Sequence, residues 1–244
     1  MKTLTEEDIK LRYITPALLN VGWTHKQILM EYNFTKGQVI VRGNIVKRGK
    51  RKKADYLLLR KNGQQPIAII EAKDESHSSG AGMQQALEYA QILDIPFAYA
   101  SNGHGFVEHD FLTGAERTLT MNEFPSESDL WSRYCLAKEI APHQDAILSE
   151  PYHFDPFTKK RPWYFQRIAI DRTVEAVAKT QKRILIVMAT GTGKTFTAFQ
   201  IIWRLLKTKT VRRVLYLADR NILIDQTMQQ DFKPFEKIMT KVQG

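Results

Sequence analysis

The sequence predicts an α/β protein made of two domains. Over residues 6–101, segments of helix and strand periodicity follow one another in the order αβββαβ. From residue 184 onwards, an apolar segment, a glycine-rich loop and an amphipathic segment predict the strand, loop and helix of a parallel sheet. We therefore expect an α/β domain at residues 1–145, a linker at 146–160 and part of a parallel-sheet domain at 161–244.

The expected elements of the first domain follow from periodicity and turn residues. Apolar Ile9, Tyr13 and Leu18 predict a buried face on an opening helix. A polar turn at residues 61–66 joins two apolar segments, which predicts a β-hairpin. The domain boundary is expected within residues 126–156, where a helix gives way to a turn-rich segment. The expected elements are a helix at 6–19, strands at 28–34, 54–60, 67–71 and 96–101, and helices at 81–93 and 130–140.

Composition narrows the class of protein. The chain has 244 residues, of which 43% are hydrophobic and 25% charged, as in soluble globular proteins. Its net charge of +10 favours a polyanionic partner, and nucleic acid is the simplest candidate. A single cysteine, Cys135, excludes a disulfide within the chain. No apolar segment is long enough to span a bilayer and no signal-peptide core is present, so we expect a cytoplasmic protein without a membrane partner.

Two carboxylates and an amine are expected to converge on the hairpin. Asp55 begins one strand and Glu71 ends the other, so antiparallel pairing brings them side by side. Lys73 projects from the same face as Glu71, because it lies two residues further along. Such a set can bind a hard divalent cation through oxygen, while the amine orients or activates the water that attacks a phosphodiester. The alternative is an ordinary salt bridge between charges at strand ends.

Further residues of this site are expected on neighbouring elements. An additional acid would complete a metal site, and the candidates are Glu7, Asp8 and Glu31. We prefer Glu31, although a surface charge is the simpler interpretation of each. The helix after the hairpin carries Gln85 and Tyr89, whose spacing of four residues puts them on one face.

A run of basic residues ends two positions before Asp55. In a solvated loop such a run has no particular function. Beside a phosphodiester site, however, it would neutralise DNA phosphates without reading bases. The residues expected to contact DNA in this way are Lys47, Arg48, Lys50, Arg51, Lys52 and Lys53.

The loop Ala189-Thr-Gly-Thr-Gly-Lys-Thr195 predicts binding of a nucleoside triphosphate. Gly191 and Gly193 would let backbone N–H groups turn towards the phosphates, at the start of a helix. Lys194 would reach the terminal phosphates, and the Thr195 hydroxyl would bind Mg²⁺. A glycine turn between a core strand and a helix is the alternative interpretation.

The motifs resemble two known families. The hairpin and the Gln85–Tyr89 spacing resemble the PD-(D/E)xK nuclease core, although Ala54 stands where that pattern has proline. The glycine loop resembles motif I of superfamily 2 helicases and translocases, whose motor domain is RecA-like. In the general phosphate-loop pattern a glycine occupies the position of Met188. The fold class expected from these resemblances is α/β, with a nuclease-like domain followed by a partial RecA-like domain with a parallel sheet.

The motor resemblance extends to segments on both sides of the loop. Upstream, Arg161-Pro-Trp-Tyr-Phe-Gln166 is similar to the Q motif, whose glutamine amide reads adenine. Downstream, the segment from Val214 to Gln226 is similar to motif Ia, which touches a nucleic-acid backbone and here includes Arg220. These resemblances imply that ATP is the nucleotide.

A nuclease core followed by such a motor resembles the R subunit of type I restriction-modification enzymes. The resemblance covers nearly the whole chain, through residues 16–23, 54–56, 71–73, 85–89, 100–103, 124–125, 130–131 and 188–195. It implies a subunit that joins methyltransferase and specificity subunits, translocates DNA with ATP and Mg²⁺, and cuts unmethylated double-stranded DNA. The implied roles are catalysis for Asp55, Glu71, Lys73, Gln85 and Tyr89; metal binding for Asp55, Glu71 and Glu31; and ATP binding for Arg161, Gln166, Thr190, Gly191, Thr192, Gly193, Lys194 and Thr195. Arg220 joins the basic run as a DNA contact.

The sequence is also compatible with other functions. No acidic box and no second RecA-like lobe follow the loop in this sequence, so we expect the N-terminal part of a motor that does not hydrolyse ATP efficiently alone. A nuclease fold without catalysis could instead serve as a DNA-binding or assembly module of a helicase-type ATPase. An ATPase of unrelated repair function is a third hypothesis.

Overall fold

The chain folds into two compact units, Met1–Ala141 and Pro142–Gly244. The computed structural model describes residues 3–35, 39–42, 45–48, 51–218 and 221–242, with only the backbone described for 39–42, 45–48 and 221–223. The segment expected to be a linker, residues 146–160, belongs to the second unit. Ile147, Leu148 and Tyr152 are buried there.

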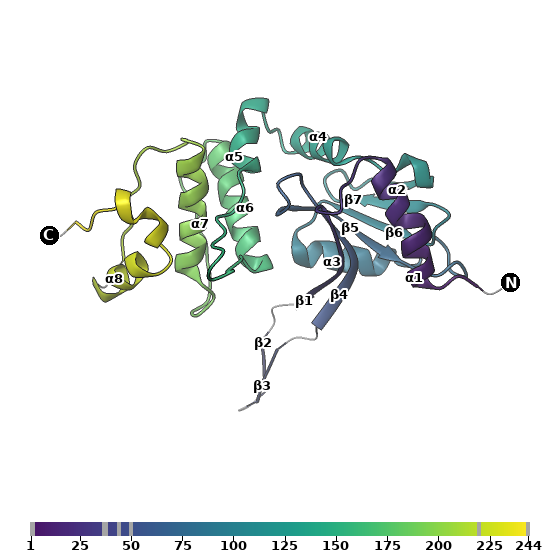
Figure 1. The fold of residues 1–244 in the computed structure, drawn as a ribbon, viewed down its shortest axis with the longest axis horizontal. Helices are drawn as coiled ribbons and strands as arrows, with labels where there is room; N and C mark the ends of the chain where they lie inside the picture. The colour runs from purple at the N-terminus through teal and green to yellow at the C-terminus, as the bar shows by residue number, and fades with distance from the viewer. Residues whose placement is uncertain (1–2, 36–38, 43–44, 49–50, 219–220, 243–244) are drawn as a thin grey trace. The chain divides into compact units, whose positions relative to one another are not determined.

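A mixed six-stranded sheet forms the centre of the first unit, with the strand order β1-β4-β5-β6-β7-β8 (Figure 1). Only β5 and β6 pair in parallel, and the other neighbours are antiparallel. A helix connects the parallel pair, because a parallel crossover needs a long connection. The strands are β1 (Ile28–Thr35), β4 (Arg51–Leu59), β5 (Pro66–Ala72), β6 (Phe97–Ser101), β7 (Phe106–Asp110) and β8 (Glu116–Leu119).

The predicted hairpin is confirmed as the antiparallel pair β4 and β5. Three features were not predicted. The first is a separate two-stranded ribbon, β2 (Val39–Arg42) and β3 (Ile45–Arg48), which lies between β1 and β4 in the chain. The second and third are the strands β7 and β8, which extend the sheet beyond β6. The short strands escape a periodicity analysis because four or five residues carry little pattern.

The helices of the first unit cover both faces of the sheet. Ile9 and Leu18 share a core with Ile70 and Ala72, so the N-terminal helices pack on that face of β5. Glu71 points to the opposite face, where Gly82 approaches it at the start of α3. The helices are α1 (Glu6–Ile9), the π-helical η1 (Lys10–Ile14), α2 (Thr15–Asn20), α3 (Met83–Leu93), the 3₁₀ turn η2 (Met121–Glu123) and α4 (Glu127–Ala137).

The opening helix predicted at residues 6–19 is interrupted by the π-helical turn η1. The Tyr56 hydroxyl donates to the backbone carbonyl of Lys10 at 3.0 Å and lies 2.9 Å from the Thr15 hydroxyl. A buried side chain of β4 therefore meets the backbone of the helix where its regular pattern changes. Single π turns of this kind often mark functional positions.

All elements assigned in the described part of the second unit are helices or helical turns. Its elements are the 3₁₀ turn η3 (Pro142–Gln144), α5 (Asp145–Ser149), α6 (Tyr164–Ala178), α7 (Lys194–Lys207), α8 (Asn221–Gln229) and the 3₁₀ turn η4 (Lys233–Ile238). A core of Phe196, Phe199, Phe232 and Phe235 joins α7 to η4. Buried Arg204 on α7 donates to Asp171 at 2.6 Å and to the carbonyl of Leu148 at 2.6 Å, which fixes α5 against the two long helices.

The strand predicted at residues 184–187 does not form, and this part of the fold prediction is wrong for the described residues. That segment and residues 214–217 have no strand assignment, and the described residues of this unit contain no parallel sheet. Leu185 and Val187 are 88% and 86% exposed. An extended segment becomes a strand only when a neighbour satisfies its N–H and C=O groups, and no described segment does so here.

Candidate active site

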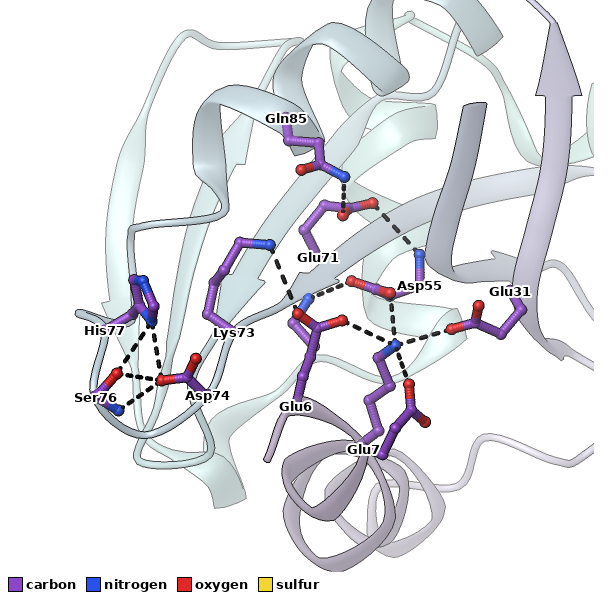
Figure 2. Close-up of polar contacts among 12 residues, drawn as sticks. Glu6, Glu7, Glu31, Asp55, Glu71, Lys73, Asp74, Ser76, His77 and Gln85 are labelled. Atoms are coloured by element: carbon purple, nitrogen blue, oxygen red, sulfur yellow. Dashed lines mark hydrogen bonds and ion pairs between the residues drawn. The ribbon is translucent and has the colours of Figure 1, made fainter. Parts of the chain in front are cut away.

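Asp55 and Glu71 face each other across the two central strands β4 and β5. Tyr56 pairs with Ile70 in the antiparallel register, which puts Asp55 opposite Glu71. The Asp55 N–H lies 3.4 Å from Glu71 Oε1, and the Ala72 N–H donates to Asp55 Oδ2 at 2.8 Å. Both carboxylates are buried, at 5% and 1% exposure. Two acids are therefore held next to each other by the backbone of the sheet (Figure 2).

Glu71 is held from α3 by the glutamine predicted for this site. Gln85 Nε2 donates to Glu71 Oε2 at 2.7 Å and lies 3.2 Å from the Tyr89 hydroxyl. Close approach of α3 requires Gly82, because a Cβ there would lie 3.1 Å from Glu71 Cβ. Burial, and then the charge of Asp55, raise the pKa of Glu71 to about 9. Burial, and then the charge of Glu71, also raise the pKa of Tyr89.

Lys73 lies just beyond the end of β5. Its N–H donates to the Ser101 carbonyl at 2.9 Å, which continues the pairing of β5 with β6 by one residue. Its ammonium lies 3.9 Å from Glu6 Oε2, and the side chain is 25% exposed. Figure 2 shows Lys73 pointing towards Glu6 on α1. The amine is thus close to the acidic pair but paired with a different carboxylate.

A buried lysine that the sequence analysis missed, Lys10, sits beside Asp55. Its Nζ lies 2.7 Å from Asp55 Oδ1, 2.8 Å from Glu31 Oε1, and 3.1 Å from both Glu6 and Glu7. Although burial alone would lower it, hydrogen bonds to Asp55 and Glu31 raise the pKa of Lys10 above its ordinary value. Lys10 is therefore a fixed positive charge.

A signal for Lys10 was present in the sequence. It precedes Ile14 by four residues, so helical spacing places it on the buried face of the first helix. Glu6 and Glu7 precede it at spacings of four and three, which are the spacings of helical ion pairs. A lysine on an apolar face, with acids one turn away, predicts a buried ion pair.

The three candidates for an additional acid have different positions. Glu31 lies opposite Asp55 in β1, with a left-handed φ of 55°, and its carboxylate contacts Lys10 and Lys53. Those two contacts lower the pKa of Glu31. Glu7 also contacts Lys10, whereas Asp8 accepts from Thr5 at the start of α1. Within the described residues, no three acid, histidine or cysteine side chains are arranged to hold a metal ion.

The donor chemistry of Asp55 and Glu71 nevertheless suits a divalent cation. Both offer hard carboxylate oxygens from rigid neighbouring strands, and Asp55 already holds an ammonium cation. Burial, and then the charge of Asp55, raise the pKa of Glu71, and a cation between the two carboxylates would oppose the effect of that charge. Two protein ligands leave room for water and phosphate oxygens, as Mg²⁺ prefers.

The glycine loop of the second unit has the backbone that phosphate binding requires. Gly191 and Gly193 have φ values of 75° and 80°, and Gly193 directly precedes α7. Gln166 on α6 donates to the Thr192 carbonyl at 2.8 Å and accepts from the Trp163 N–H at 2.9 Å. A Cβ on Gly193 would collide with the Gln166 amide. The glutamine predicted to read adenine thus supports the loop directly.

Other residues predicted to bind the nucleotide lie on or near this loop. Lys194 Nζ contacts the carbonyls of Met188 and Ala189 at 3.3 and 3.2 Å and is exposed. Thr190 is exposed, and Thr195 lies in the first turn of α7. The Arg161 guanidinium lies 5.1 Å from the centre of the Phe154 ring.

Comparison with known proteins identifies the family of both segments. The family described as the N terminus of the type I restriction enzyme R protein matches residues 23–125. The family described as the res subunit of type III restriction enzymes matches residues 159–244. The EcoAI type I restriction endonuclease subunit of Escherichia coli is 48% identical over the whole chain. The chain belongs to the R-subunit family of type I restriction enzymes.

Further relatives agree with this R-subunit assignment. The EcoKI type I endonuclease subunit of Escherichia coli K12 is 26% identical over 72% of this chain. A solved fragment of an HsdR subunit of a type I restriction enzyme from Vibrio vulnificus YJ016 has a TM-score of 0.73 and 43% identity, and the match covers 86% of this chain and 39% of that one. The chain spans 30% of the EcoAI subunit and 18% of the EcoKI subunit.

The basic run of this R-subunit chain adjoins the acidic site. Lys52 contacts Glu88 at 2.7 Å, with its Nζ 5.0 Å from the centre of the Tyr89 ring, while Lys53 contacts Glu31. Arg51 is exposed at the start of β4. Lys47 and Arg48 lie on β3 with undescribed side chains, and Lys50 and Arg220 lie outside the described residues. No helix in the described ranges is long and apolar enough to cross a membrane.

Proposed function

We propose that this chain carries the nuclease site and the nucleotide loop of a type I restriction R subunit. The activity is Mg²⁺-dependent cleavage of unmethylated double-stranded DNA, coupled to ATP-driven translocation by the whole subunit. The observation that carries the proposal is the placement of Asp55 opposite Glu71, with Gln85 holding the second oxygen of Glu71. It supports a PD-(D/E)xK nuclease domain at residues 1–145, of which the first unit covers Met1–Ala141. The glycine loop before α7 separately supports the start of a RecA-like motor domain from residue 161.

Asp55 and Glu71 would hold the metal ion. Bound there, Mg²⁺ supplies positive charge to the phosphodiester and lowers the pKa of a water ligand. Because burial and Asp55 raise the pKa of Glu71 to about 9, Glu71 must lose its proton as it becomes a ligand. Gln85 then fixes one oxygen of Glu71 by donation, which leaves the other to face the ion.

Lys73 would act on the water or on the phosphate. Its ammonium is partly exposed and lies at the long distance of 3.9 Å from Glu6, so small side-chain rotations separate them. Free of Glu6, it can donate to the attacking water or to a phosphate oxygen. Tyr89 supports Gln85 from the same helix. Exposed Arg51 and the neighbouring lysines would hold the DNA backbone through phosphate contacts.

The nucleotide loop and the partners complete the proposal. The loop from Thr190 to Thr195 would bind ATP and Mg²⁺, with Gln166 and Arg161 at the adenine side. Gln166 already bonds the loop carbonyl of Thr192, so adenine recognition and loop conformation would be coupled. Methyltransferase and specificity subunits are the proposed partners, and they would select the DNA.

One observation favours a second function, that of a DNA-binding or assembly module without catalysis. Asp55 is bonded to Lys10 and to the Ala72 N–H, and Lys73 is near Glu6, so every group expected to act has an internal partner. In that case DNA affinity would be independent of Asp55, Glu71 and Lys73.

Calorimetric titration of the chain with Mn²⁺ tests the proposal, because cleavage requires partners whereas ion binding does not. We expect saturable binding that is lost in Asp55→Ala and in Glu71→Gln. Asp94→Asn is the matched control, since Asp94 is an exposed acid at the far end of α3 whose left-handed conformation asparagine tolerates. Absence of binding in the unaltered chain would contradict the nuclease proposal and favour the binding module.

A further inference from the structure

Lys10 is a buried cation that the proposed mechanism does not use. Its side chain is 2% exposed, and four carboxylates lie within 3.1 Å of its Nζ. An ammonium has three N–H donors, so the four acids exceed what one lysine can bond at once. One of these four acids, Asp55, is also a proposed ligand of the metal ion. The cluster around Lys10 and the metal site therefore share a carboxylate.

The contacts of Asp55 show which of its oxygens already binds a cation, the Lys10 ammonium. Its Oδ2 accepts from the Ala72 N–H, while its Oδ1 lies against Lys10. Glu71 lies on one side of Asp55, and Glu7 and Glu31 lie on another (Figure 2). Both of these acids contact Lys10. The ammonium thus holds a position among the four carboxylates of Asp55, Glu6, Glu7 and Glu31. While Lys10 is in place, these acids surround an ammonium, and no three of the described acids are arranged to hold a metal ion. Their hard oxygens are nevertheless the ligand type that a divalent cation takes.

The backbone fixes Lys10 in this position from two directions. Its carbonyl accepts from the hydroxyl of Tyr56, the residue next to Asp55 on β4. Glu31 has a left-handed φ of 55°, a conformation that costs about 1 kcal/mol or more in a residue with a side chain, and its carboxylate meets Lys10. A conformation of this kind persists only where the surroundings hold it.

We propose that Lys10 is a built-in cation that positions Asp55 and takes the place of a second divalent ion. The inference rests on the proposed function and deepens it. The site then binds one ion, between Asp55 and Glu71, and the Lys10 ammonium holds the carboxylates of Asp55, Glu31 and Glu7 on the other side through ion pairs. Lys10 is a positioning residue, because it acts through Asp55.

Counting bound Mn²⁺ by calorimetry and by electron paramagnetic resonance tests this proposal. We expect one ion per unaltered chain and two in Lys10→Met, which removes the charge but keeps a long side chain. Lys10→Arg retains a cation and should bind one. Lys10→Met combined with Glu31→Gln should return to one ion, since the vacated position then has fewer carboxylates. The same number of ions in Lys10→Met as in the unaltered chain, or two ions in the unaltered chain, would overturn the proposal.

A second variant keeps the test decisive if Lys10→Met does not fold. Glu31→Gln alters a residue that is 36% exposed and leaves Lys10 in place. We expect it to bind one Mn²⁺ with affinity within about threefold of the unaltered chain. Loss of the ion in Glu31→Gln would make Glu31 a metal ligand and overturn the role of Lys10. By contrast, the unaltered chain could bind no ion while Lys10→Met gains one. That result would contradict the proposed nuclease function but would support the role of Lys10 as a built-in cation.

Discussion

The two units of this chain differ in whether their strand-forming segments pair with a neighbouring strand. In the first unit, strands β1 and β4–β8 pair into one sheet, and its buried acids Asp55, Glu71, Glu108, Asp110 and Glu127 all have polar partners among the described residues. In the second unit, the apolar segments 184–187 and 214–217 have no strand neighbour among the described residues, and Leu185 and Leu215 are 88% and 74% exposed.

This difference shows that a local sequence pattern can favour an extended backbone without determining whether a sheet forms. Apolar residues of strand propensity favour an extended backbone in both units. A sheet also requires a second strand for the backbone hydrogen bonds, and that partner is specified elsewhere in the chain. The glycine loop, by contrast, has its positive φ angles without a sheet. Local geometry of a site and completion of its fold are therefore separate properties.

The largest expected effect is on the acidic site of the first unit. In a complete R subunit assembled with its partners, Asp55→Ala and Glu71→Gln should reduce DNA cleavage by about 10²–10³-fold, because charge stabilisation at the phosphodiester is lost. A plasmid cleavage assay measures this, with Asp94→Asn as the control. Near-normal cleavage in both site variants would remove the nuclease role from the first unit.

Truncation of an apolar residue should be costly in the first unit and nearly neutral in segment 184–187 of the second. Leu58→Ala should lower the free energy of unfolding by about 2–5 kcal/mol, because Leu58 is fully buried in the sheet. Leu185→Ala should change it by less than about 0.5 kcal/mol, since that side chain is 88% exposed. Urea denaturation of the chain checks both values. A cost above about 2 kcal/mol for Leu185→Ala would show that its segment is packed in solution.

Alanine substitution should have a smaller effect at Gly191 than at Gly193, the two glycines of the nucleotide loop. Gly191→Ala and Gly193→Ala both place a side chain at positive φ, which costs about 1–2 kcal/mol. Only at Gly193 would the new Cβ collide with the Gln166 amide, so Gly193→Ala should destabilise the chain more and weaken ATP binding further. Fluorescent nucleotide titration and thermal unfolding measure the two effects. Adding Gln166→Ala should recover part of the Gly193→Ala loss, and absence of recovery would separate Gln166 from the loop.

A pH dependence of the first unit's stability should come from Glu71. Its pKa is about 9 in the folded chain against an ordinary 4.5, so the folded state keeps a proton that the unfolded state loses between these values. The free energy of unfolding should therefore fall as pH rises from about 4.5 to about 9, and level off above. Glu71→Gln should flatten that decline in denaturation series run with a chelator. An equally steep decline in the variant would assign it to other groups.

The sequence predicted the site of the first unit better than the elements around it. The polar turn at residues 61–66 specified the hairpin, and hairpin pairing suffices to bring Asp55 beside Glu71. Gln85 could be assigned because helical spacing orients it with Tyr89. The helical spacing around Lys10 indicated a buried ion pair with Glu6 and Glu7. Its contact with Asp55 could not be predicted, because it joins a helix to a strand distant in sequence.

In the second unit the loop was predicted well and the sheet was not. Glycine positions report backbone conformation directly, so Gly191 and Gly193 were informative by themselves. The strand at residues 184–187 was predicted from apolar content, which reports a tendency to be buried but not the partner that buries it. The contact of Gln166 with the Thr192 carbonyl depends on how α6 meets the loop, which sequence spacing leaves undetermined.

Anomalous diffraction from crystals of this chain soaked in Mn²⁺ tests the central claim most directly. We expect one manganese peak between the carboxylates of Asp55 and Glu71, with Lys10 still bonded to Asp55 and Glu31. A peak at the position of Lys10, or none near Asp55 while the chain binds Mn²⁺ elsewhere, would contradict it.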